Sequence, residues 1–101
     1  MTRPKKLDNL LEAIREHLDT DQFRFTVHAE QRCVQRKVND LEVEYVLRNG
    51  WHEKRKDKYD EAYQAWNYAV RGETMDEDRD LRVIVSFDGD MLIITVIDTT
   101  K

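Results

Sequence analysis

The chain has 101 residues, of which 40% are apolar and 38% charged, so we expect one compact folded domain with a heavily charged surface. Its net charge of −4 argues against a simple nucleic-acid binder, because binding to phosphates usually requires a basic balance. The single cysteine excludes an internal disulfide and a zinc site built on cysteines, and no apolar run is long enough to span a bilayer. We therefore expect a cytoplasmic protein without a membrane partner.

The first half of the sequence has mainly helical patterns. Leucine and isoleucine recur at three- and four-residue intervals, which predicts a leading helix over 7–19 with one apolar face. Over 23–50 we expect a short extended segment followed by two helices. Alternating phenylalanines indicate the extended segment, and the helix after it is predicted at about 28–37.

The third helix has the clearest local signals. Asn39 is a good N-cap, Glu42 can close a capping box, and Val38 and Val43 have the spacing of a hydrophobic staple. Gly50 is expected to end this helix, because glycine accepts the left-handed conformation common at helix C-termini.

The second half predicts an antiparallel sheet over 51–98, with a hairpin at Asp88-Gly89. The last two strands are apolar on both faces, so we place them at the centre of the sheet. The expected strands span 51–56, 63–71, 81–87 and 91–97. The predicted fold over 1–101 is a single α+β domain, with two to three N-terminal helices packed on one face of a three- to four-stranded antiparallel sheet.

His28, Arg32 and Arg36 recur every four residues, which places them on one face of the second helix. Histidine can accept and donate a proton near neutral pH, and arginine offers a planar fork of donors that suits phosphate. Such a set could cleave RNA without a metal. The alternative is a surface in which the arginines pair with Glu30 or Glu42 and His28 is only a helix cap.

A second group of residues suggests contacts with RNA. Aromatic side chains near cations can stack on bases and bind the backbone of a single strand. They can equally form the core or a dimer contact. The candidate substrate-binding residues are Arg24, Lys54, Arg55, Trp66 and Tyr68.

Thr95 lies in an otherwise apolar strand. Threonine is common in strands, so this residue has an ordinary structural explanation. If the strand packs behind the helix that carries His28, its hydroxyl could reach the same cleft. We assign no metal site and no cofactor, because His17 and His52 have no partners at ligand spacing.

The order of these features resembles a family of small bacterial domains of unknown function with a T-x-H-A-x-x-R-x-x-x-R signature. The resemblance covers roughly residues 25–99, and the matching positions are His28, Ala29, Arg32, Arg36, Gly50, Gly72 and Thr95. That family is distantly similar to the RelE, barnase, EndoU and colicin group of metal-independent ribonucleases, many of which are toxins of toxin–antitoxin pairs. The chain departs from RelE-like toxins in being acidic, and its leading helix lies outside the resemblance.

The resemblance implies a RelE-like fold and an endoribonuclease-like, toxin-type domain that acts on RNA. In this hypothesis His28 is the general acid or base, Arg32 and Arg36 bind phosphate, and Thr95 belongs to the same catalytic site. The partners would be RNA and an antitoxin-like protein. The alternative is a non-catalytic domain that binds another protein or forms a homodimer through the aromatic face of its sheet.

Overall fold

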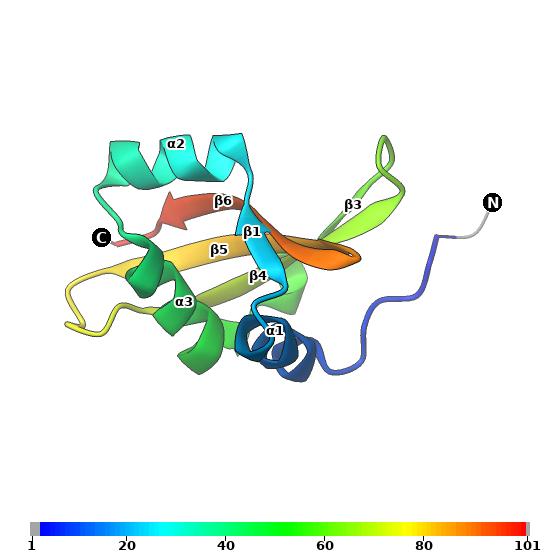
Figure 1. Ribbon diagram of the computed structural model, residues 1–101, viewed down its shortest axis with the longest axis horizontal. Helices are drawn as coiled ribbons and strands as arrows, with labels where there is room; N and C mark the ends of the chain where they lie inside the picture. The colour runs from blue at the N-terminus through cyan, green and yellow to red at the C-terminus, as the bar shows by residue number, and fades with distance from the viewer. Residues whose placement is uncertain (1–2, 101) are drawn as a thin grey trace.

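The computed structural model of the protein describes residues 3–100 and confirms the predicted α+β class (Figure 1). The helices are α1 (Leu10–Asp19), α2 (Val27–Arg36) and α3 (Asp40–Asn49), with a short 3-10 helix, η1 (Lys54–Lys56). The strands are β1 (Phe23–Phe25), β2 (Trp51–His52), β3 (Lys58–Asp60), β4 (Ala65–Glu73), β5 (Asp80–Asp88) and β6 (Asp90–Asp98).

The strand order is β1-β6-β5-β4-β2, with β3 pairing to β4 away from this path. As predicted, the two most apolar strands, β5 and β6, are internal to the sheet. The sheet differs from the predicted one in two respects. The extended segment β1 joins it as a parallel partner of β6. The single strand expected at 51–56 is wrong beyond β2, because η1 follows it, and the unpredicted strand β3 comes after η1.

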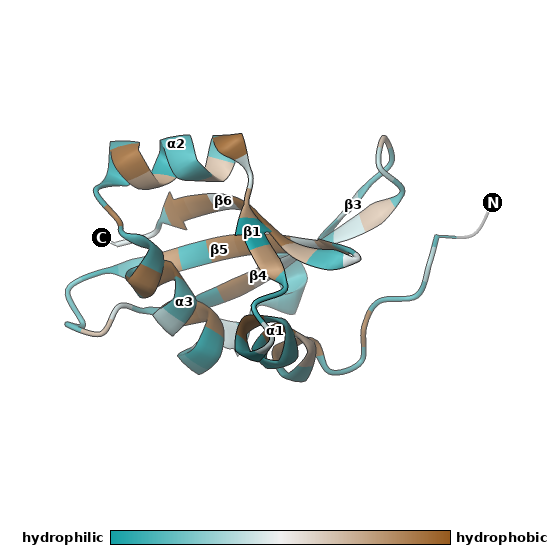
Figure 2. Cartoon of the chain, in the orientation of Figure 1, coloured by the Kyte–Doolittle hydropathy of each residue, from teal (hydrophilic) through white to brown (hydrophobic). Residues whose placement is uncertain are grey.

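The hydrophobic core is formed by the sheet and the helices α1, α2 and α3. Each helix contributes an apolar stripe at helical spacing, and the facing strands contribute alternate residues. Figure 2 shows how apolar residues dominate β5 and β6. The core residues of these elements include Leu10, Ile14 and Leu18 of α1, Val43, Val46 and Leu47 of α3, Val70 of β4, Val83 and Val85 of β5, and Ile93 of β6.

The other side of the sheet is here called the outer face. Along β5, Leu81, Val83 and Val85 are fully buried toward the core, so the intervening Arg82 and Ser86 point to the outer face. The helix α2 covers neither face completely. It packs against β6 next to the short edge strand β1 (Figure 1), with Ala29 and Cys33 buried, as predicted for its inner side.

The third helix confirms the predicted N-terminus and corrects the predicted C-terminus. The Asn39 side chain accepts from the Glu42 amide at 2.8 Å, and the Glu42 carboxylate accepts from the Asn39 amide at 3.1 Å. Gly50 has φ −79 and ψ −168, so the predicted left-handed cap is wrong. Glycine is required there by space, because a Cβ would lie 2.6 Å from the Val46 carbonyl oxygen and still closer to that of Arg71.

Candidate functional site

The start of α2 is fixed to β6 by a single threonine. The Thr26 hydroxyl caps the helix by accepting from the Ala29 amide at 3.1 Å, and it donates to the Ile94 carbonyl at 3.1 Å. The Thr26 amide donates to the Ile93 carbonyl at 3.0 Å. The register shifts by one residue at this point, which leaves Ile94 as an extra residue in β6. These bonds determine where His28 lies relative to the sheet.

His28 lines a cavity of about 560 Å³ on the outer face, which we call the His28 cavity. Thr26 and His28 form one wall, and the β3–β4 hairpin forms another through Tyr63. Ser86 and Leu92 contribute to the floor. The volume lies within the range of roughly 300–1,000 Å³ that is usual for small-molecule sites.

The floor of the cavity belongs to a row of residues that crosses the sheet. Arg24 of β1 pairs with Leu92 of β6, and Leu92 pairs with Ser86 of β5. The antiparallel β4–β5 register, continued by one residue, places Asn67 beside Ser86, and Asn67 pairs with Lys58 of β3. Laterally paired residues point to the same face, so this row has a cation at each end and polar groups at its centre.

Arg32 and Arg36 follow His28 along α2 and lie outside the cavity lining. The Arg32 guanidinium donates to the Gln35 side chain at 2.9 Å, and the Arg36 carbonyl accepts from Arg79 at 2.6 Å. Within residues 3–100, neither guanidinium has a carboxylate within the 4.0 Å of an ion pair. The alternative interpretation requires Arg32 and Arg36 to pair with Glu30 or Glu42, and the structure does not contain these ion pairs.

Thr95 is close to this region without lining the cavity. It directly follows the extra residue Ile94 and pairs with Ile84, which places its side chain on the outer face of β6. The structure therefore brings Thr95 to the face and the strand against which His28 is fixed.

The aromatic residues predicted to contact substrate lie on the opposite face. Tyr68 is 4% exposed and belongs to the core, where its hydroxyl accepts from the Leu7 amide at 3.0 Å. Trp66 donates to the Pro4 carbonyl at 2.7 Å, and the Lys6 ammonium lies 5.1 Å from its ring centroid. The N-terminal arm covers these side chains, so the structure does not join them to His28.

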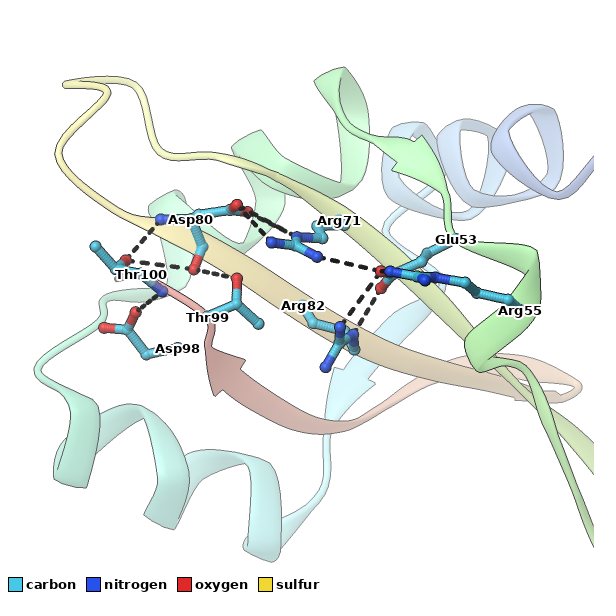
Figure 3. A network of polar contacts seen from close by, with 8 residues as sticks. All are labelled: Glu53, Arg55, Arg71, Asp80, Arg82, Asp98, Thr99 and Thr100. Carbon is cyan, nitrogen blue, oxygen red and sulfur yellow. Dashed lines mark hydrogen bonds and ion pairs between the residues drawn. The ribbon is translucent and has the colours of Figure 1, made fainter.

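Lys54 and Arg55 are exposed in η1, next to a network of buried charge on the outer face (Figure 3). Glu53 is fully buried and accepts from Arg82 Nε at 2.6 Å and from Arg71 Nη1 at 3.3 Å. The Arg55 guanidinium lies 3.7 Å from the same carboxylate. The hydrogen bond from Arg82, and to a smaller extent that from Arg71, holds the pKa of Glu53 below its usual value.

Arg71 connects this network to the start of β5. Its Nε and Nη2 donate to the Asp80 carboxylate at 3.2 and 3.0 Å, and these bonds, with that to Glu53, raise the pKa of Arg71. The network thus connects three segments: the residue after β2, the second half of β4 and the first half of β5. Its cations are already paired, so it is a structural clamp on the outer face.

Residues 25–98 match the model of a family described as a domain of unknown function (DUF4258). The chain belongs to the DUF4258 family. No curated protein and no solved structure matches it. The membership confirms the predicted resemblance at the level of a small domain of unknown function.

The DUF4258 match contains His28, Arg32, Arg36, Thr95 and the whole lining of the His28 cavity, but not Arg24. It begins at Phe25, just before the threonine that fixes α2, and ends at the last residue of β6. It excludes α1, as the sequence resemblance did. The helix α1 therefore supports this DUF4258 domain from outside the matched region, by packing against α3 on the core side.

Residues 3–100 of this DUF4258 protein contain neither a membrane-spanning helix nor a cluster of metal-binding side chains. None of the described helices is long and apolar enough to cross a membrane. The same residues contain no cluster of three or more histidine, cysteine, aspartate or glutamate side chains placed to bind a metal ion.

The sequence reasoning did not select the floor of the cavity or the Glu53 network. Ser86 was a usable signal, because it follows the apolar run Val83-Ile84-Val85 much as Thr95 follows Ile93-Ile94. Arg82 and Arg71 also lie inside strands, where a charged side chain needs a partner. That partner, Glu53, could not be identified, because it comes from an irregular segment distant in sequence.

Proposed function

We propose that this DUF4258 domain is an endoribonuclease-like domain in which side chains, rather than a metal ion, handle the proton transfers on RNA. The observation that carries the proposal is the pair of hydrogen bonds that join the Thr26 hydroxyl to α2 and to β6, because they hold His28 in the lining of a cavity. β-Bulges such as the one at Ile94 are often found beside active sites, where they aim a side chain.

The proposed reaction begins with a proton transfer from the ribose 2′-hydroxyl to the neutral imidazole of His28. The resulting oxygen nucleophile attacks the adjacent phosphorus, and the bond to the 5′-oxygen of the next nucleotide breaks. That oxygen takes up a proton from a water molecule as it leaves, so the products are a 2′,3′-cyclic phosphate and a free 5′-hydroxyl. Proton transfer of this kind usually contributes about 10²–10⁴-fold to the rate.

The arginines of α2 would stabilise the charge that develops on the phosphate. Arg32 and Arg36 lie about one and two helical turns from His28, so an extended phosphodiester backbone can follow the helix past all three residues. Neither guanidinium forms an ion pair with a carboxylate within residues 3–100, which supports a role in binding anions. The Thr95 hydroxyl, on the neighbouring outer face of β6, would add a neutral donor to the phosphate.

The test is cleavage of a panel of fluorescent single-stranded RNAs by the full chain. We expect His28→Ala to lower the cleavage rate by about 10²–10⁴-fold. The double variant Arg32→Ala/Arg36→Ala should mainly weaken RNA binding. Arg48→Ala is the matched control, because it removes an arginine of α3 whose guanidinium pairs at 2.8 Å with Asp19. If no RNA in the panel is cleaved, or if His28→Ala keeps the full rate, the proposal is wrong.

A toxin role adds a cellular expectation. Expression of the unmodified chain would arrest bacterial growth, and expression of His28→Ala to the same level would not. An antitoxin-like partner would restore growth by binding this protein. Growth arrest that persists in the His28→Ala strain would refute a role for the proposed chemistry in toxicity.

The second candidate function is binding to a protein or to a second copy of the chain. The observation that favours it is a strip of exposed apolar side chains on the outward side of α2, where Val27 is 71% and Val34 79% exposed. Light scattering after gel filtration tests this function. A monomer whose behaviour is unchanged by Val27→Ser/Val34→Ser would exclude the homodimer.

A further inference from the structure

The floor of the His28 cavity contains a polar group without a partner. Ser86 is only 5% exposed, yet within residues 3–100 its hydroxyl makes no hydrogen bond. The hydroxyl opens into the cavity, since no fully enclosed side-chain atom in the described residues lacks a partner. The hydroxyl is therefore free to bond to a group that enters the cavity.

The charged groups around this hydroxyl are acidic. Asp88 follows Ser86 on the same side of β5, lines the cavity and has no hydrogen bond or ion pair to its carboxylate within the described chain. Asp60 also lines the cavity, but its Oδ1 already accepts from the amides of Ala62 and Tyr63 at 3.0 and 3.2 Å. Among residues 3–100, no lysine or arginine lines the cavity. The cavity therefore suits a group that offers N–H donors and disfavours a phosphate.

The remaining surface of the cavity suits a flat, uncharged ring. Leu92 and Ile94 present apolar side chains from β6, and Tyr63 presents an aromatic ring from the exposed tip of the β3–β4 hairpin. Asn67 adds a side-chain amide beside Ser86, and no hydrogen bond engages this amide within residues 3–100. Apolar walls with a few polar groups at fixed places are the usual composition of sites that bind nucleobases.

We propose that the His28 cavity binds the base of the nucleotide whose 2′-hydroxyl is activated by His28, and that it prefers guanine. This inference rests on the proposed function. Guanine is the one neutral RNA base that presents two N–H donors side by side, from N1 and the exocyclic N2. A carboxylate such as that of Asp88 can accept both in a paired, fork-like arrangement. The Ser86 hydroxyl and the Asn67 amide then bond to the remaining polar edge of the base.

The experiment measures binding, so that it does not depend on cleavage. Guanosine, inosine, adenosine and uridine 3′-monophosphates are titrated into the full chain, and dissociation constants are obtained by calorimetry. Inosine differs from guanosine only in lacking the N2 amino group. Loss of one hydrogen bond to a charged acceptor should weaken binding of the inosine nucleotide about tenfold.

Asp88→Asn tests the acceptor, and Asp90→Asn is its matched control. Both aspartates are exposed and flank Gly89 in the same turn, but only Asp88 lines the cavity. Asp88→Asn should remove most of the guanosine preference, whereas Asp90→Asn should keep it. Ser86→Ala, a smaller change inside the sheet, should weaken all four nucleotides without a change in melting temperature.

The outcomes separate this inference from the proposed function. RNA cleavage that depends on His28 but shows no base preference, with Asp88→Asn unchanged, overturns the guanine site and leaves the nuclease proposal standing. A guanosine preference that Asp88→Asn removes supports the base site even if no RNA is cleaved. Equal binding of the guanosine and inosine nucleotides, or no binding of any nucleotide, overturns it.

Discussion

Replacing Glu53 by glutamine is expected to destabilise the protein more than any other single charge removal on the outer face. The carboxylate is fully buried and is the shared acceptor of Arg82 and Arg71. Glutamine keeps the shape of the side chain but cannot neutralise the arginines. Arg71 retains Asp80, whereas Arg82 loses its carboxylate partner.

The magnitude follows from burial. Removing one member of a buried charge pair usually costs about 3–5 kcal/mol, because the other charge remains without compensation. The Arg82 side chain is 16% exposed, so water can solvate part of its guanidinium. We therefore expect the lower end of this range, about 3 kcal/mol. In a domain of this size that loss lowers the melting temperature by something on the order of 10–20 °C.

The assay is thermal and urea unfolding followed by circular dichroism. Glu61→Gln is the matched control, because Glu61 forms an exposed ion pair with Arg3 and its side chain is 73% exposed. That control should change the free energy of unfolding by no more than about 0.5 kcal/mol. If Glu53→Gln unfolds within the same margin of wild type, the view of the network as a clamp is wrong.

The difference in stability between wild type and Glu53→Gln should depend on pH. The folded pKa of Glu53 lies below the ordinary glutamate value of 4.5, so the carboxylate stabilises the folded state fully at pH values above 4.5. This contribution is lost as the pH falls through the lowered folded pKa. The stability gap between wild type and Glu53→Gln should therefore be constant from neutral pH to about 4.5 and narrow below it. A gap that does not narrow on acidification would contradict the lowered pKa.

Three further variants test the backbone around the site. Gly50→Ala should destabilise strongly or prevent folding, because its Cβ would overlap the carbonyl oxygens of Val46 and Arg71; a wild-type melting temperature would refute this. Gly89→Ala has open space but a φ of +74, so we expect a loss of only about 1–2 kcal/mol in urea unfolding. Asn39→Ala removes one half of the capping box and should cost about 1 kcal/mol, measured in the same way, with an unchanged value as the contrary result.

The helices could be predicted well because their signals are local. The capping box of α3 depends on residues three positions apart, and the sequence shows both of them. Local signals predicted a left-handed cap at Gly50, which is wrong. Glycine is needed there because the carbonyl of Arg71, on a strand distant in sequence, leaves no space for a Cβ. At the end of α2 it is Lys37, with φ +56, that adopts the left-handed conformation, and no glycine marks this position.

Periodicity in the sequence predicts the long strands but not the short ones or their pairing. β5 and β6 are long and apolar enough to be recognised and placed internally, whereas β2 has only two residues. The parallel pairing of β1 with β6 could not be read from alternation, because a three-residue strand does not specify its partner. That pairing nevertheless determines the site, since it delivers the chain directly to Thr26 and α2.

The candidate site was predicted in part. The spacing of His28, Arg32 and Arg36 places them on one helical face, and the structure has that helix. Trp66 and Tyr68 alternate along β4 as expected, but which face an alternating strand turns to the core depends on tertiary packing. Their catalytic and binding roles remain predictions that the cleavage and binding assays address.

The polar groups on the two halves of the outer face differ in whether they have partners within the chain. An exposed sheet face leaves apolar and polar groups in contact with water, and here no helix covers it completely. One half is closed by the Glu53 network, in which each buried charge has its partner within the chain. The other half is bounded by His28 and the β3–β4 hairpin, and its Ser86 hydroxyl and Asp88 carboxylate have no partner within residues 3–100. Because the first half is already satisfied and clamps β4 to β5, the second can remain open without loss of order in the sheet, which is the condition for binding a ligand there.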